Sequence, residues 1–228
     1  PEVIWAMPRL GTFNLHASLL PQYRGAAPIN WAIINGETET GVTTFLLNHE
    51  IDKGAILDQV RVPIGPEDTV GTMYERLMNI GTSLVTQTVD RIAAGDITPV
   101  EQQSVDERTL RPAPKIFKED CRIDWTRPGK RIVDFIRGLS PYPAAWTEMY
   151  REGDATPSTV KIFSASFEPA PHDEPCGTIE SDGRTLIRVA CADGWLTLGE
   201  LQLAGKKRLA VRELLLGWRD VNLCRFHR

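Results

Sequence analysis

The pattern of apolar and polar positions in the first part of the chain, together with its β-rich composition, predicts three short strands. A β-strand turns successive side chains to opposite faces, so alternation over about four to eight residues marks a half-buried strand. Residues 12–16 alternate in this way, residues 56–64 alternate imperfectly, and residues 41–47 are rich in residues that favour strands. We expect these segments to form one sheet.

Apolar positions at helical spacing predict two helices among these strands. One begins at Pro28, which suits the first turn of a helix, and stops at Gly36. The other covers residues 70–94, with Thr69 as its N-cap and Gly95 just past its end. Its apolar stripe predicts a core position rather than cofactor binding.

The second half of the chain predicts a different architecture. Residues 97–116 are rich in proline and lack apolar periodicity, which indicates a linker. A helix opened by Pro128 follows, and short strands separated by turns then predict a small barrel. The predicted strands are residues 146–150, 160–167, 177–180, 185–191 and 195–203, with a closing helix at 211–216. The predicted division is therefore a domain of residues 1–96, a linker of 97–116 and a domain of 117–228.

Composition adds the class of protein. With 228 residues, of which 42% are hydrophobic and 25% charged, the chain suits two modest globular domains. No apolar run approaches the roughly 18 residues of a membrane helix, and no signal peptide is evident. The four cysteines lie far apart, which favours free thiols in a reducing compartment. We therefore expect a cytoplasmic protein without a membrane partner.

The charge is distributed unevenly along the chain. Residues 1–105 contain 6 Lys and Arg against 12 Asp and Glu, whereas residues 106–228 contain 20 against 18. The second half is not basic enough to establish nucleic-acid binding, but its cations can still gather on one surface. For the linker cations, a solvated surface and phosphate contacts stay equal alternatives.

Candidate chemistry begins with Asn14 and His16, two positions apart on the first predicted strand. Positions i and i+2 share a face of a strand, so both side chains are expected to project together near its end. An imidazole can move a proton at neutral pH, and a carboxamide can hold a developing oxyanion. The pair suits acyl transfer, although a packed strand histidine beside a turn asparagine has the same spacing.

Asp52 and its neighbours offer further alternatives. The Asp-x-Gly at residues 52–54 is by itself typical of a turn. Ser18 could complete a serine nucleophile with His16 and Asp52, but it lacks the Gly-x-Ser-x-Gly elbow. A metal site with His49 would need more converging ligands than this region offers, so we predict none.

A longer string of residues changes the weight of these alternatives. Asn-Leu-His-Ala-Ser-Leu-Leu-Pro at 14–21 precedes Arg-Gly-Ala-Ala-Pro at 24–28 and Asp-Lys-Gly at 52–54. This order and spacing closely resembles the catalytic pattern of the folate-dependent formyltransferases. The similarity runs through nearly all of the chain and is greatest to the members that formylate methionyl-tRNA.

The resemblance implies a fold and a reaction. The implied fold is α/β, with the second half of a doubly wound formyltransferase sheet followed by an OB-like β-barrel domain, and roughly ninety residues of the family pattern precede this chain. The implied reaction transfers a formyl group from 10-formyltetrahydrofolate to the amino group of methionyl-initiator-tRNA. Asn14, His16 and Asp52 would be catalytic, no metal would be needed, and the folate would contact Ser18, Leu19, Leu20 and Pro21.

The tRNA partner predicts a set of cationic contacts. Arg24 is expected either to contact the acceptor end or to support its own loop. The remaining candidates are cations on the linker and after the last strand, namely Arg111, Lys115, Lys206, Lys207 and Arg208. We expect a monomer. Two alternatives stay open: an amino-sugar formyltransferase of the same family, and a non-catalytic tRNA-binding fragment.

Overall fold

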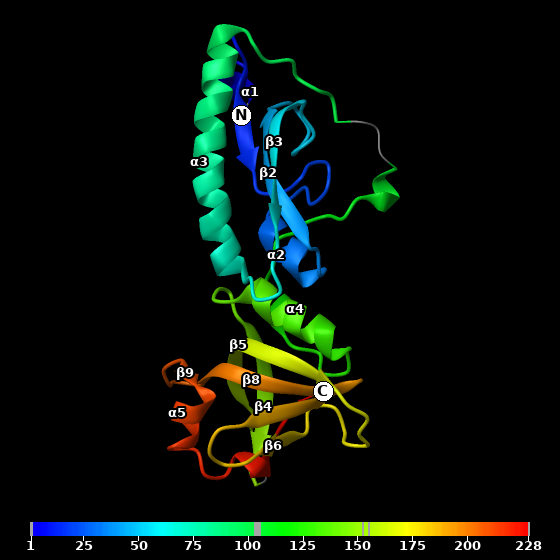
Figure 1. Ribbon diagram of the computed structural model, residues 1–228, viewed down its shortest axis with the longest axis vertical. Coiled ribbons are helices and arrows are strands. Elements are labelled where there is room, and N and C mark those ends of the chain that lie inside the picture. The colour runs from blue at the N-terminus through cyan, green and yellow to red at the C-terminus, as the bar shows by residue number, and fades with distance from the viewer. Residues whose placement is uncertain (1, 103–105, 152, 155, 228) are drawn as a thin grey trace. The chain divides into compact units, whose positions relative to one another are not determined.

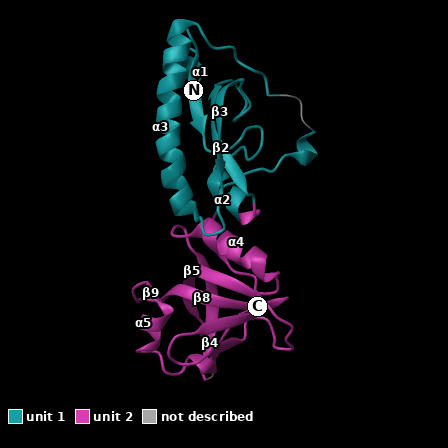
Figure 2. Ribbon diagram, in the orientation of Figure 1, with its two compact units in different colours: residues 1–33, 37–116 teal, residues 34–36, 117–228 magenta. Residues whose placement is uncertain are grey.

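The computed structural model describes residues 2–102, 106–151, 153–154 and 156–227. The chain divides into two compact units (Figure 2). Unit 1 comprises residues 1–33 and 37–116, and unit 2 comprises residues 34–36 and 117–228. The predicted linker, residues 97–116, thus falls within unit 1, where part of it pairs with other segments.

Unit 1 is built on a three-stranded sheet in the order β1-β2-β3, with β1 at Phe13–His16, β2 at Glu39–Leu46 and β3 at Ile56–Pro63. The three predicted strands are confirmed with small shifts at their ends. Both pairings are antiparallel, and β2 and β3 are joined directly by a loop rather than by the crossover that parallel strands need. The α/β content is confirmed, and the doubly wound arrangement, which these pairings do not include, stays a prediction.

Three helices accompany this sheet: α1 (Glu2–Trp5), α2 (Pro28–Ile34) and α3 (Val70–Ala94). The long α3 runs along the sheet (Figure 1) and packs on β2 and β3. Met73 and Leu77 are almost fully buried in the resulting core, together with Ile33 of α2 and Val42 of β2. The apolar stripe of α3 is therefore core, as predicted.

The ends of α3 are set by the predicted residues. The side chain of Thr69 accepts a hydrogen bond from the N–H of Thr72, and the side chain of Thr72 accepts one from the N–H of Thr69. At the other end, Gly95 adopts a left-handed conformation at φ 70° and donates its N–H to the carbonyls of Arg91 and Ile92. Glycine adopts this conformation without a Cβ penalty, which ends the helix there.

Unit 2 is a strongly curved sheet with α4 (Gly129–Leu139) against β5 and β8. Its strands are β4 (Ala145–Arg151), β5 (Ser158–Pro169), β6 (Ile179–Ser181), β7 (Ile187–Cys191), β8 (Gly194–Leu203), β9 (Leu209–Ala210) and β10 (Cys224–Phe226), with helix α5 at Val211–Leu215. The order is β10-β4-β5-β8-β7-β6, with β9 beside β8. The five predicted strands and the closing helix are confirmed, whereas β9 and β10 were not predicted.

The sheet of unit 2 nearly closes into a barrel. An isolated bridge pairs Thr178, just before β6, with Arg225 of β10, so the two ends of the strand order meet. Inside, the fully buried Trp125 stacks on Phe226 at 5.3 Å and donates its indole N–H to the hydroxyl of Thr147. A small β-barrel is confirmed, and its OB-like assignment stays a prediction.

Two further observations bear on the class of protein. The four cysteines are free, and burial raises the pKa of the thiols of Cys121, Cys191 and Cys224. Within the described residues, no helix combines the length and the apolar character that crossing a membrane requires.

Short 3-10 helices complete the structure at Glu107–Thr109, Glu119–Cys121 and Val221–Leu223.

The cap of α3 yields a stability prediction. Replacing Thr69 by Ala removes the hydrogen bond to the N–H of Thr72, so the free energy of unfolding should fall by about 1 kcal/mol. Thr86→Ala is the matched control, because Thr86 is exposed on the same helix and its hydroxyl bonds back to the carbonyl of Thr82. Alanine favours a helix interior, so the control should raise stability by up to about 0.5 kcal/mol. Urea unfolding measures both, and equal effects would contradict the capping role.

Candidate functional site

Strand β1 sets the direction of Asn14 and His16. Leu15, between them, packs against the core of unit 1, where it meets Gly81 of α3 so closely that a Cβ there would lie 2.6 Å from its side chain. Because neighbouring strand residues point to opposite faces, Asn14 and His16 face away from α3. Asn14 is exposed and His16 is buried.

The carboxamide of Asn14 is oriented by the backbone of the next residue. Its Oδ1 accepts a hydrogen bond from the N–H of Leu15 at 2.9 Å. Among the described residues, none forms a hydrogen bond with the Nδ2 group of Asn14. The arrangement leaves two N–H donors that can hold an oxygen atom on which negative charge develops.

Both ring nitrogens of His16 face oxygen atoms. The Nε2 atom lies 2.8 Å from the carbonyl of Tyr23. A carbonyl can only accept, so Nε2 is the donor. The Nδ1 atom lies 3.8 Å from Oδ2 of Asp52, which is beyond a direct hydrogen bond. Asp52 is therefore a close neighbour of the Nδ1 edge of the ring, and the Nε2 edge is engaged by the Tyr23 carbonyl.

Asp52 is held on the loop between β2 and β3. Its Oδ2 accepts a hydrogen bond from the N–H of Gly25 at 2.9 Å, and its backbone has a positive φ of 55°. Two residues later, a Cβ on Gly54 would lie 1.6 Å from the carbonyl oxygen of Leu46. The glycine of the Asp-x-Gly pattern is therefore required by a close approach of the backbone.

Lys53, the next residue after Asp52, forms ion pairs with two other carboxylates. Lys53 pairs with Glu50 at 2.8 Å and with Glu107 at 3.4 Å. The hydrogen bond to Glu50 is the main cause that raises the pKa of Lys53, and it lowers the pKa of Glu50. Glu50 and Glu107 are exposed and Lys53 is half-buried, so these surface pairs add little to stability.

The loop predicted to bind folate is fixed by internal hydrogen bonds. The buried hydroxyl of Ser18 donates to the carbonyl of Gln22 at 2.7 Å. The backbone carbonyl of Ser18 accepts a hydrogen bond from the hydroxyl of Thr43 at 2.6 Å. Gln59 donates to Thr43 and to the carbonyl of Leu20, whose side chain is also buried. The Ser18 hydroxyl is thus engaged and buried, which does not favour the serine-nucleophile alternative.

The predicted linker pairs with the loop that precedes α2. Arg111 accepts a hydrogen bond at its carbonyl from Tyr23, and Ala113 donates to the carbonyl of Arg24 and accepts from Ala27. The approach is close, since a Cβ on Gly25, at φ 127°, would lie 2.4 Å from the carbonyl oxygen of Ala113. These bonds fix the loop that carries the N–H donor to Asp52.

Two predicted tRNA contacts of unit 1 have protein partners. Arg24 donates through Nε and Nη2 to the side-chain oxygen of Gln102. Arg111 pairs with Glu37 and also donates to the hydroxyl of Tyr23. The hydrogen bond to Tyr23, followed by the charge of Glu37, raises the pKa of the Arg111 guanidinium. Lys115 is exposed. The sequence did not predict the partners Tyr23 and Gln102, because nothing in their local pattern marks them.

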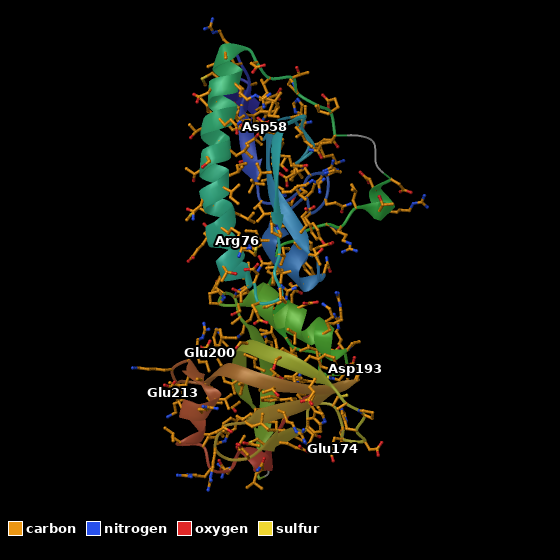
Figure 3. The ribbon with its side chains drawn as sticks, viewed as in Figure 1. Asp58, Arg76, Glu174, Asp193, Glu200 and Glu213 are labelled. Carbon is orange, nitrogen blue, oxygen red and sulfur yellow. The ribbon has the colours of Figure 1, made fainter. Side chains whose placement is uncertain are left out.

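The remaining predicted cations lie in unit 2, between β8 and β9. Arg208 pairs with Glu200 of β8, labelled in Figure 3, and lies 4.2 Å from the ring centre of Phe163. Lys206 and Lys207 are exposed, and within the described chain no acidic group forms a salt bridge with either. The structure leaves these two charges available to a partner.

The other candidates do not gather into a site. His49 is exposed, pairs with Glu2 at 3.5 Å and packs edge-on against Trp5, away from His16. Among the described residues, no group of three His, Cys, Asp or Glu side chains is placed to hold a metal ion. A pocket of about 590 Å³ in unit 2, lined partly by Tyr150, Cys176 and Arg225, includes none of the predicted site residues.

Comparison with known proteins places this geometry in context. The family model described as "Formyl transferase" matches residues 1–89, and that described as "Formyl transferase, C-terminal domain" matches residues 115–219. The methionyl-tRNA formyltransferase of Parabacteroides distasonis is 57% identical over 223 residues, which is 97% of this chain and 68% of the relative. That of Bacteroides fragilis is 57% identical over 220 residues, which is 96% of this chain and 67% of the relative.

Solved structures of lower identity share the fold. HypX from Aquifex aeolicus in complex with tetrahydrofolic acid has a TM-score of 0.68 at 20% identity, covering 100% of this chain and 40% of its own. The N-formyltransferase from Helicobacter canadensis in complex with folinic acid and dTDP-3-aminofucose has a TM-score of 0.61 at 21% identity, covering 86% and 66%. At these identities the likeness concerns the fold alone.

Proposed function

This chain belongs to the formyl transferase family, and we propose that it transfers a formyl group from 10-formyltetrahydrofolate to the amino group of methionyl-initiator-tRNA. The product is formylmethionyl-tRNA for translation initiation. Relatives named methionyl-tRNA formyltransferase, 57% identical over nearly the whole chain, support this acceptor. The observation that supports the chemistry is the 3.8 Å separation of Asp52 from the His16 ring, with Asn14 two residues before His16 on the same face of β1.

The reaction passes through a tetrahedral intermediate. The methionyl amine attacks the formyl carbon, and the formyl oxygen takes up negative charge. The Nδ2 donors of Asn14 stabilise that oxygen together with the Nδ1 edge of the protonated His16 ring, because Nε2 is engaged by the Tyr23 carbonyl. Binding the charge more tightly in the transition state than in the ground state is what accelerates the step.

Asp52 completes the proton movement. Its carboxylate balances the charge on His16 and accepts a proton from the attacking amine, directly or through a water molecule. The proton then passes to the folate nitrogen that leaves. The N–H of Gly25 holds the carboxylate in place during this exchange.

The donor and the overall organisation are also part of the proposal. The folate lies against the loop of Ser18, Leu19, Leu20 and Pro21, where the buried side chains of Ser18 and Leu20 leave mainly backbone groups to contact it. HypX bound to tetrahydrofolic acid has the same fold, which supports a folate donor. A doubly wound sheet, an OB-like second domain and a cytoplasmic, monomeric enzyme complete the proposal.

The catalytic assignment gives the first functional prediction. Replacing Asn14, His16 or Asp52 by Ala in the intact enzyme should lower kcat by at least about a hundredfold each, the usual scale for an oxyanion donor or a general acid–base group. Folding should change little for Asn14 and Asp52, which lie at a strand end and in a loop. Formylation kinetics with saturating substrates measure kcat.

His49→Ala is the matched control for His16→Ala. His49 is an exposed loop histidine with no contact to Asp52 in the described structure, so its loss should leave kcat within about twofold of the original enzyme. A folded His16→Ala enzyme with near-normal turnover would refute the mechanism.

The tRNA contacts are proposed for two groups of cations. Lys206 and Lys207 carry exposed charges in unit 2, and Arg208 lies beside them with its charge partly neutralised by Glu200. Arg24, Arg111 and Lys115 are the candidates of unit 1. Phosphate contacts of such cations give binding that weakens steeply with salt.

A double variant tests the first group. Lys206→Ala together with Lys207→Ala should raise KM for charged tRNA and reduce its salt dependence, while KM for the folate donor stays unchanged. For every lysine–phosphate pair that the substitutions remove, the slope of log K against log salt should become shallower by about one. Kinetics at several salt concentrations measure both quantities.

The control removes the same charge elsewhere in unit 2. Lys130 and Lys161 are exposed, on α4 and β5, and their double replacement by Ala should leave the tRNA slope unchanged. Because Lys130 pairs with the buried Asp134, which Arg137 also contacts, unfolding curves check that this variant is folded. Equal slopes for the two double variants would remove Lys206 and Lys207 from the interface and favour the amino-sugar alternative, whose small acceptor needs no such contacts.

A further inference from the structure

The side chain of Gln102 connects the two loops that form the candidate site. Its Nε2 donates to the backbone carbonyls of Asp52 at 2.8 Å and Gly54 at 2.9 Å. Its Oε1 accepts from Nε of Arg24 at 3.2 Å and from Nη2 at 2.5 Å. One half-buried amide thus satisfies groups from both loops.

The position of Gln102 follows from backbone pairing. Val100 and Ile56 exchange two hydrogen bonds of 2.8 Å in an antiparallel bridge. Continuing that register by two residues brings Gln102 opposite Gly54. The backbone of Gln102 is therefore placed by pairing with the start of β3, and the side-chain amide lies within reach of the Asp52 loop.

The hydrogen bond between the Gly25 N–H and the Asp52 carboxylate joins the two loops that Gln102 connects. Gly25, whose N–H donates to Oδ2, adjoins Arg24, and Asp52 itself has a strained positive φ. We propose that Gln102 is a positioning residue that fixes the carboxylate of Asp52 relative to His16 by holding the Asp52 and Arg24 loops together. This inference rests on the proposed function for its kinetic consequence.

The chemistry of the side chain is specific. A primary amide offers two donors and an acceptor on one planar group, which matches two carbonyls on one side and a guanidinium on the other. A glutamate of the same length can still pair with Arg24, but it cannot donate to the two carbonyls. The isosteric glutamate therefore separates support of the Asp52 loop from support of Arg24.

Kinetics of Gln102→Met and Gln102→Glu in the intact enzyme test the proposal. Small displacements of a catalytic group reduce rates strongly, so both variants should lower kcat about tenfold or more. Gln102→Glu, which can still pair with Arg24, should leave KM for tRNA and folate within about twofold. In an Asp52→Ala background, Gln102→Met should cause less than about a twofold further loss, because its effect acts through Asp52. Gln87→Met, on the exposed face of α3, is the matched control and should change neither constant.

Amide hydrogen exchange of Gly25 gives a readout that needs no activity. The N–H of Gly25 should exchange faster in Gln102→Met than in the original protein, and unfolding curves identify any variant that is not folded. Unchanged exchange, full turnover of Gln102→Glu, or an undiminished loss in the Asp52→Ala background would overturn the proposal. If the original enzyme transfers no formyl group, the proposed function fails, and the exchange rate alone decides the positioning role.

Discussion

The hydrogen bond from the N–H of Gly25 to the carboxylate of Asp52 is the constraint on which the candidate site depends. It joins a loop that follows β1 to a loop that follows β2, and it places the carboxylate 3.8 Å from His16. At that separation the carboxylate influences the ring by charge, and a proton can pass between them only after a small movement or through water. The close backbone contacts at Gly25 and Gly54 explain why both positions are glycine.

The scaffold supports this contact from two sides. On one side, Leu15 packs against α3 and turns Asn14 and His16 outward. On the other, backbone bonds from Arg111 and Ala113 to the loop that precedes α2 hold the N–H of Gly25 in its direction. Several of these supports are hydrogen bonds within polar loops. The loops are anchored to the buried core that α3 forms with the sheet.

The sequence predicted the elements of this scaffold well where local signals are strong. Thr69 and Gly95 mark the ends of α3 through capping chemistry, and the strands are marked by alternation in β1 and by the β-rich composition of β2. The strand β10 was missed because three residues carry no pattern and depend on pairing with the distant β4. The pairing of Arg111 and Ala113 with the loop before α2 was not predicted for a similar reason: backbone hydrogen bonds leave no signature in a polar, proline-rich segment. The candidate catalytic residues were identified through the family resemblance, whereas their supports, Tyr23 and Gln102, became visible only in the structure.

The central claim is that this site formylates the amine of an aminoacyl-tRNA. The most direct measurement offers charged initiator tRNA, glycinamide ribotide and a nucleotide-linked amino sugar in parallel to the intact enzyme, with 10-formyltetrahydrofolate as donor. We expect kcat/KM for methionyl-initiator-tRNA to exceed the other two values by at least about a hundredfold, since acceptor choice reflects differential binding of the transition state. A higher value for the amino sugar or the ribotide would contradict the claim.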